Sequence, residues 1–129
     1  MGKSKLPVPS ESVEQICLFR WAMYEEGKYP ELALMYHIPN GGKRSITTAK
    51  RLKAEGVKAG VPDIHLPVAR NGFYGLYIEL KKKKGNSTTE NQDHWLEALN
   101  SQGYYAVVCR GWEEASKTIL SYLGDGKLL

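Results

Sequence analysis

The sequence predicts a single α/β domain in which helices flank a central mixed β-sheet. Segments with helical spacing of apolar residues alternate along the chain with short runs rich in β-branched, aromatic and leucine residues. One helical segment lies between two such runs, which implies a crossover connection and therefore a parallel pair of strands. The 129 residues, 42% of them hydrophobic, suit one domain with its own core. The expected order is α-β-α-β-β-α-β-α, in a domain at residues 11–124 between a flexible basic arm (1–10) and a tail (125–129).

The first element is predicted to be a helix over residues 11–26. Ser12 and Gln15 have the spacing of a capping box, and Gly27 can end the helix. Glu14 lies beside the apolar stripe, so its carboxylate is placed along the edge of the core. The expected buried face consists of Val13, Ile16, Cys17, Trp21 and Tyr24.

Residues 31–38 alternate well enough to predict a strand, and the PNGG sequence at 39–42 is typical of a turn. A short helix is expected over residues 45–55, with Gly56 at its end. Cations are dense in this helix and just before it, so the segment is a candidate for contacts with an anionic partner. These cations are Lys43, Arg44, Lys50, Arg51 and Lys53.

Two strands are expected near residues 63–68 and 73–82, joined around Asn71-Gly72, which is a hairpin signal. Side chains alternate between the faces of a strand, so odd and even residue numbers separate the two faces. The apolar residues of both strands have even numbers. They are Ile64, Leu66 and Val68 in the first strand, and Leu76, Ile78 and Leu80 in the second.

The length of the hairpin loop decides whether these apolar sets share a face. A two-residue loop would pair Arg70 with Phe73 and place the sets on opposite faces of the sheet. A three-residue loop at 70–72, with Gly72 in the left-handed conformation, pairs Ala69 with Phe73 and brings the sets together. Because a one-residue slip is costly when one face is buried, the three-residue loop is predicted.

This register gathers charged side chains on the less apolar face of the hairpin. Asp63 lies opposite Glu79, and Lys81 follows two residues later on the same face. Opposed carboxylates about 5 Å apart repel each other, and a hard divalent cation such as Mg²⁺ relieves the repulsion. The lysine can then stabilise charge on a phosphate or orient an attacking water. The alternative is an ordinary solvated strand end with a surface ion pair.

The second half of the chain supplies a helix, a strand and a last helix. The helix is expected over residues 88–102, with Ser87 and Glu90 as its capping box and Gly103 at its end. Gln92 lies on the same side as its apolar stripe, one turn before it. The strand covers 104–109, and an amphipathic helix follows. The three tryptophans, Trp21, Trp95 and Trp112, occupy helical stripes and suit core positions better than base-stacking platforms.

Composition excludes several classes of protein. No apolar run approaches the roughly 20 residues that a membrane span needs, and the N-terminal sequence MGKSKLPVPS lacks the apolar region of a signal peptide. The three histidines and two cysteines lack zinc-binding spacing. The net charge of +4 is compatible with an anionic partner but does not require one.

Four stretches in this order resemble the VRR-NUC domain of the PD-(D/E)xK nuclease superfamily, in the stand-alone form found in phages and bacteria. The resemblance covers residues 11–111 approximately, and it implies a restriction-endonuclease-like core. The stretches are IPNGGKR (38–44), KAGVPDIHL (58–66), LYIELK (76–81) and NQDHWLEAL (91–99).

The resemblance implies a role for each matching residue. Asp63 and Glu79 would bind Mg²⁺ or Mn²⁺ together with the carbonyl of Leu80, and Glu14 would complete the metal shell directly or through water. Lys81 would be the catalytic lysine, and Gln92 would support the site. The cations Lys43, Arg44, Lys50, Arg51 and Lys53 would follow the DNA backbone. Lys82 is a further candidate for a phosphate contact, although a solvated strand end explains Lys82, Lys83 and Lys84 equally well.

The implied activity is that of a structure-selective endonuclease that hydrolyses DNA phosphodiesters. Stand-alone members resemble homodimers that cut four-way (Holliday) junctions, in the cytoplasm of a bacterium or of a phage-infected host. Two active sites related by a two-fold axis suit a junction with two scissile strands. A flap or restriction-type nuclease is the alternative within the same class. A nucleic-acid-binding module without catalysis, with a merely structural acidic pair, is the alternative outside it.

Overall fold

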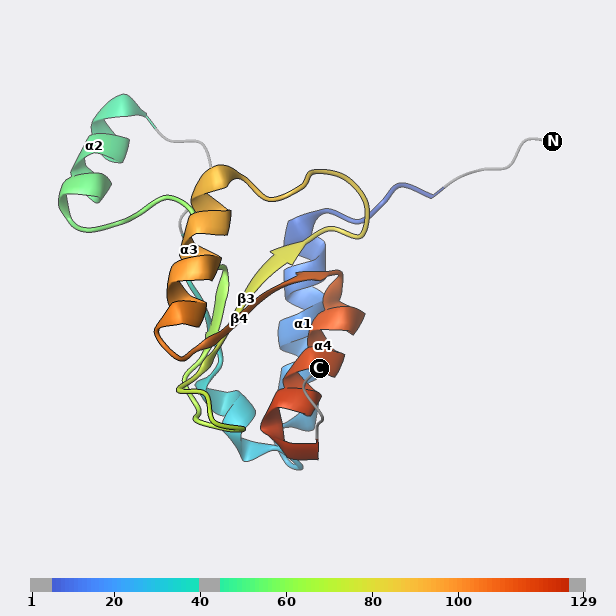
Figure 1. The fold of residues 1–129 in the computed structure, drawn as a ribbon. Helices are drawn as coiled ribbons and strands as arrows, with labels where there is room; N and C mark the ends of the chain where they lie inside the picture. The colour runs from blue at the N-terminus through green and yellow to red at the C-terminus, as the bar shows by residue number, and fades with distance from the viewer. Residues whose placement is uncertain (1–5, 40–44, 126–129) are drawn as a thin grey trace.

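The computed structural model describes residues 6–39 and 45–125, and its centre is a four-stranded mixed sheet (Figure 1). The strand order is β1-β2-β3-β4. The first two pairs are antiparallel, and β3 pairs with β4 in parallel across an intervening helix. The predicted fold class, including its crossover, is therefore confirmed. The strands are β1 (Tyr36–His37), β2 (Ile64–Leu66), β3 (Leu76–Lys81) and β4 (Tyr105–Arg110).

Helices cover both faces of this sheet. In Figure 1, α1 and α4 lie together on one side, α3 lies on the other, and α2 stands apart from the sheet near one end of α3. Among the described helices, none is long and apolar enough to cross a membrane. The helices are α1 (Glu11–Glu25), α2 (Ile46–Ala54), α3 (Glu90–Ser101) and α4 (Trp112–Leu120), with a 3-10 helix η1 (Pro30–Leu34) and a π-helical turn η2 (Ser121–Asp125).

The hydrophobic core lies between the sheet and the layer of α1 and α4. Even-numbered side chains of β2 and β3, as predicted, point into it and meet Leu18 and Ala22 of α1 and Ile119 of α4. Odd-numbered positions of β3 face the other way, so Glu79 and Lys81 lie on the α3 side of the sheet. The alternation of β3 thus separates the core from the charged residues.

The predicted buried face of α1 is wrong for most of its members, although Trp21 packs against the core. Ile16 is 50% exposed and Tyr24 is 87% exposed, whereas Glu14, Leu18 and Ala22 are buried. These three residues recur every four positions and so share the face of α1 that packs inward, and α1 is in contact with α4. A charged residue inside the buried stripe misled the sequence interpretation, because helix stripes are recognised by their apolar members.

The predicted start of α1 at residue 11 is confirmed, but the predicted capping box is wrong. Ser10, and not Ser12, is the N-cap, and its hydroxyl accepts a hydrogen bond of 3.2 Å from the Val13 amide. Ser12 lies inside the first turn of the helix. Both serines satisfy the preference of the N-cap position for a short polar side chain, so the sequence alone does not distinguish them.

The strand predicted over residues 31–38 is reduced to the two residues of β1. The 3-10 helix η1 takes up residues 30–34, with Pro30 at its start. Leu32 and Met35 are the buried residues here, and their spacing of three matches a 3-10 turn. Of the turn predicted at 39–42, residues 40–42 lie outside the described part of the chain.

The hairpin loop differs from the prediction, although the strand register does not. Arg70 and Phe73 exchange two backbone hydrogen bonds around a two-residue Asn71-Gly72 turn. Both turn residues have positive φ, +52° and +84°, as a type I′ turn requires. The pairing of Ile64 with Ile78 is nevertheless the predicted one.

An extra residue between β2 and the turn reconciles these two observations. Four steps separate Leu66 from Arg70, while three separate Phe73 from Leu76, so residues 67–69 form a bulge. Pro67 has no amide proton, and the Val68 amide bonds back to the Leu66 carbonyl at 2.8 Å. The predicted three-residue loop was wrong because the bulge absorbs the residue assigned to the loop.

Tyr122 fixes the bulge, and its hydroxyl provides a test of stability. The buried hydroxyl donates a 2.6 Å hydrogen bond to the Val68 carbonyl. Tyr122→Phe should lower the free energy of unfolding by about 1–2 kcal/mol, because it leaves that carbonyl without its donor. Urea unfolding measures the change, and Tyr24→Phe is the exposed control. Equal stability of both variants would mean that the hydroxyl does not support the bulge.

Candidate active site

Asp63 and Glu79 come together where β2 and β3 pair. Asp63 directly precedes β2, and its Oδ2 accepts a 2.8 Å hydrogen bond from the Leu80 amide. The Asp63 carbonyl accepts hydrogen bonds from the Ile38 amide (2.6 Å) and contacts His37 Nδ1 at 2.9 Å. Two neighbouring segments, residues 37–38 and β3, therefore hold the backbone and the carboxylate of Asp63.

The electrostatics of this pair favour a bound cation. Burial, followed by the neighbouring Asp63 carboxyl, raises the pKa of Glu79 to about 8. Burial also raises the pKa of Asp63, although the Leu80 amide opposes the shift. Glu79 is 2% exposed, and its Oε1 has no hydrogen-bond partner within the described chain. A buried carboxylate oxygen left without a donor carries a large desolvation cost.

Lys81 is a buried cation on the same face. Its side chain is almost fully enclosed, and Nζ lies 4.0 Å from Glu79 Oε2. A lysine is seldom buried unless an anion accompanies it. The ordinary solvated strand end considered from the sequence therefore does not describe Glu79 and Lys81.

Gln92 connects α3 to the acidic pair through its side-chain amide. Its Nε2 donates a 2.9 Å hydrogen bond to Glu79 Oε2, while its Oε1 accepts one of 2.9 Å from the Thr89 amide. The second bond belongs to a capping box, since the Thr89 hydroxyl accepts from the Gln92 amide in return. The capping box orients the Gln92 amide, so that its NH₂ group faces Glu79.

The capping box predicted at Ser87 and Glu90 is therefore wrong. Thr89 is the N-cap, and Glu90 is the first residue of α3. The sequence STTENQ offers capping spacings from both Ser87 and Thr89, and the apolar pattern does not distinguish them.

Glu14 is buried in α1 and caps α4. Its Oε1 accepts a 2.9 Å hydrogen bond from the Trp112 amide, at the first turn of α4. Its Oε2 has no hydrogen-bond partner among the described residues. A carboxylate at a helix N-terminus is stabilised by the free amides and by the helix dipole. Glu14 thus uses Oε1 to hold the start of α4, while Oε2 has no partner among the described residues.

The described part of the chain contains no group of three or more His, Cys, Asp or Glu side chains arranged to hold a metal ion. A pair of carboxylates is nevertheless sufficient for Mg²⁺, which usually takes one or two carboxylates and fills the other positions with waters and substrate oxygens. The raised pKa of Glu79 and its unpartnered Oε1 are the observations that fit such an ion. The donor set is therefore compatible with a hard divalent cation.

The predicted DNA-binding cations occupy two places. Lys50, Arg51 and Lys53 are exposed on α2, where Arg51 also pairs with Glu55 at 3.4 Å. Lys82 is half-buried just after β3. Lys43 and Arg44 lie outside the described residues.

Two neighbours of the site were not predicted as site residues. His37 contacts the Asp63 carbonyl, and the pairing of β1 with β2 places it there. Arg110 donates from Nη1 to the Lys82 carbonyl (3.1 Å) and from Nη2 to the Asn86 carbonyl (2.7 Å), so it holds the segment after β3. The parallel pairing of Lys81 with Arg110 sets this position, and no local sequence motif marks it.

Gly60 makes the close contact that fixes the segment before Asp63. A Cβ at this position would lie 2.7 Å from the backbone carbon of Asn91, and φ is +92°. Gly60→Ala should push this segment off α3, lower stability by about 1–3 kcal/mol and disturb Asp63. Gly56→Ala is a matched control, because φ is +104° there but the space is open. Equal thermal shifts for both variants would contradict the role of the contact.

Comparisons with known proteins agree with this fold. The VRR-NUC domain family model matches residues 10–113. A solved structure titled "VRR_NUC domain protein" is 30% identical to the chain, with a TM-score of 0.80 over 95% of this chain and 94% of that one. No curated protein shows significant similarity to the chain.

Proposed function

Because the chain belongs to the VRR-NUC domain family, we propose that it is a divalent-metal-dependent, structure-selective DNA endonuclease that hydrolyses phosphodiesters in four-way junctions. The family implies a nuclease-type function with DNA as the partner. The observation that carries the proposal is the pair of half-buried Asp63 and buried Glu79, whose raised pKa values and unpartnered Glu79 oxygen suit a cation, with Lys81 beside it.

Asp63 and Glu79 would hold Mg²⁺ or Mn²⁺ with the carbonyl of Leu80, and Glu14 would contribute through its free oxygen or through water. When bound, such an ion supplies positive charge that stabilises a phosphate in its transition state. The Leu80 amide orients Asp63, and the amide of Gln92 orients Glu79, so the chain positions both carboxylates before any ion arrives. Gln92 is therefore a positioning residue.

Lys81 would act on the scissile phosphate. Its ammonium is held by Glu79 in a site from which water is largely excluded. In such surroundings a fixed positive charge stabilises developing negative charge more strongly than it would in water. It can also orient the attacking water.

The cations of α2 and its preceding segment would follow the DNA backbone. Such contacts give affinity without base specificity and weaken steeply with salt. These cations are Lys43, Arg44, Lys50, Arg51 and Lys53, with Lys82 closer to the acidic pair. A homodimer would place two such tracks around the two-fold axis of a junction.

The proposal is tested with labelled four-way junction, flap and linear duplex of matched sequence. Cleavage of the junction that requires Mg²⁺ or Mn²⁺ and stops in chelator is the expected result, with a dimer in sedimentation. Faster cleavage of the flap would replace the junction with the flap as the substrate. Binding of all three DNAs without cleavage in either metal would leave a binding module and reject the nuclease.

A further inference from the structure

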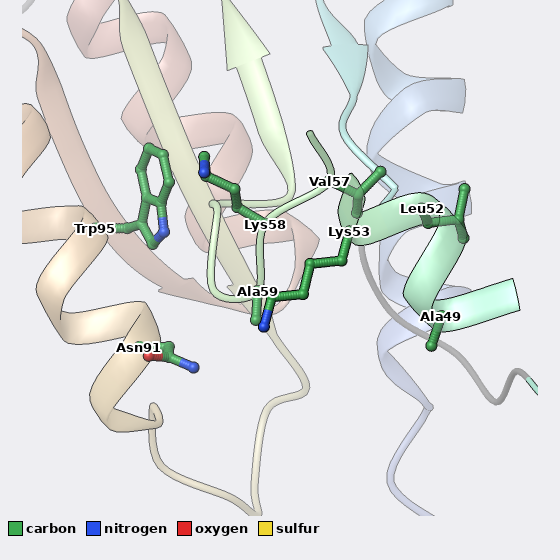
Figure 2. A pocket seen from close by; sticks show the side chains of 8 residues that line it. All are labelled: Ala49, Leu52, Lys53, Val57, Lys58, Ala59, Asn91 and Trp95. Atoms are coloured by element: carbon green, nitrogen blue, oxygen red, sulfur yellow. The ribbon is translucent and has the colours of Figure 1, made fainter. Parts of the chain in front are cut away.

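A groove runs between α2 and the first turns of α3, beside the candidate active site. Its volume is about 560 Å³, within the range of pockets that hold small ligands. Figure 2 shows Trp95 and Asn91 on α3 facing Lys58 and Lys53 across this space. The apolar surface of the groove comes from Ala49, Leu52, Val57 and Ala59.

Trp95 does not take the core position predicted from its stripe. Trp21 and Trp112 pack against the buried core, whereas Trp95 is half-buried and lines the groove. An indole left at an open surface offers a face on which a planar ring can stack. Base–aromatic stacking of this kind works with every base.

The charge of the groove selects an anionic occupant. The residues that line it include two lysines, Lys53 and Lys58, and no carboxylate. Neither lysine forms an ion pair within the described chain. An indole, two free ammonium groups and the Asn91 amide match the three parts of a nucleotide, which are a flat base, a phosphate and the polar edge of the base.

We propose that this groove binds one unpaired or unstacked nucleotide of the DNA substrate, with its base on Trp95 and its phosphate between Lys53 and Lys58. The proposal rests on the proposed nuclease function and adds a feature of the substrate. A fully paired duplex keeps its bases stacked inside the helix, so only a branch point, flap or gap presents such a nucleotide.

The groove is joined to the acidic pair from two sides. Asn91 precedes Gln92, whose amide is bonded to Glu79. On the other side, Gly60 packs directly on the Asn91 backbone, three residues before Asp63. The segments that line the groove therefore also carry the residues that hold the acidic pair, so a nucleotide bound in the groove would belong to the same DNA that the site engages.

The test measures binding in EDTA, where cleavage is not needed. Two duplexes of the same sequence are compared by fluorescence anisotropy, one with a single unpaired 2-aminopurine and one fully paired. The wild-type chain should prefer the unpaired form and quench its 2-aminopurine. Trp95→Ala should weaken binding of that form by about 10- to 100-fold and abolish the quenching, with little change for the paired duplex. Trp95→Phe should retain both.

The lysines provide a second test that does not depend on the folding of Trp95→Ala. The exposed pair Lys53→Ala/Lys58→Ala should weaken binding of the unpaired form several-fold more than that of the paired duplex. Lys117→Ala, an exposed cation on α4, is the matched control and should change neither. Equal losses for both duplexes, or an acidic peptide that competes as well as DNA, would overturn the proposal.

The outcomes separate the groove from the nuclease. One outcome is a chain that prefers the unpaired form through Trp95 and yet cleaves no DNA in Mg²⁺ or Mn²⁺. That result would support nucleotide binding in the groove and contradict the nuclease activity. Cleavage without any preference for the unpaired form would support the nuclease activity and contradict nucleotide binding in the groove.

Discussion

Replacing Lys81 with alanine is expected to lower the rate of DNA cleavage by about 10²- to 10⁴-fold while DNA affinity stays nearly unchanged. Lys81 is buried beside Glu79, so its charge acts on a group inside the site and not on the distant DNA backbone. Affinity should survive because the exposed cations of α2 are untouched. Single-turnover cleavage and anisotropy in chelator measure the two quantities separately.

Two controls make the Lys81→Ala result specific. Lys117→Ala removes an exposed cation from α4 and should leave cleavage intact. Thermal unfolding of Lys81→Ala shows whether the buried Glu79 tolerates the loss of its cation. A folded variant that cleaves at the wild-type rate would remove Lys81 from the mechanism.

Glu79→Gln is expected to abolish cleavage while making the metal-free protein more stable at pH 8. Burial raises the pKa of Glu79 from 4.5 to about 8 in the folded state. A raised folded pKa means that the folded protein holds this proton more tightly than the unfolded chain. Stability without metal should therefore fall as pH rises from about 4.5 to 8, by an amount on the order of a few kcal/mol. Glutamine stays neutral at every pH, so Glu79→Gln removes the part of this pH-dependent loss of stability that comes from Glu79.

Metal should reverse this pH dependence. Mn²⁺ binds the ionised carboxylates of the folded state, so it should raise Tm most at pH 8 in the wild-type chain and little in Glu79→Gln. Thermal unfolding at pH 5, 6.5 and 8, in chelator and in Mn²⁺, gives all the values needed. Glu97→Gln, an exposed glutamate of α3, is the control. If wild-type Tm in chelator rises between pH 5 and 8, the raised pKa of Glu79 is contradicted.

The alternation of the hairpin was the most informative part of the sequence. It predicted that even-numbered residues of β2 and β3 form the core and that Glu79 and Lys81 face away from it, as the structure has them. This succeeded even though the loop was wrong, because the burial of one face fixes the register over several residues while a single bulge alters only the turn.

Contacts between distant segments could not be predicted in the same way. Glu14 was placed at the edge of the core, but its burial depends on the amide of Trp112 at the start of α4. Trp95 has the spacing of a core residue, yet the position of α2 leaves it in a groove. Local periodicity predicts neither the burial of Glu14 nor the position of Trp95, since each depends on how separate elements pack.

The bond between Glu14 and the Trp112 amide joins residues 98 positions apart in the chain. During synthesis from the N-terminus, α1 leaves the ribosome long before α4 exists. Until α4 packs, the Glu14 carboxylate lacks the Trp112 amide, and α1 lacks one of the elements against which it packs. A growing chain that already contains Asp63, Glu79 and Lys81 therefore holds Glu14 without the amide that fixes its carboxylate. The placement of Glu14 is tied to the last helix, so an incomplete chain presents the cell with acidic and basic side chains that lack this part of their arrangement.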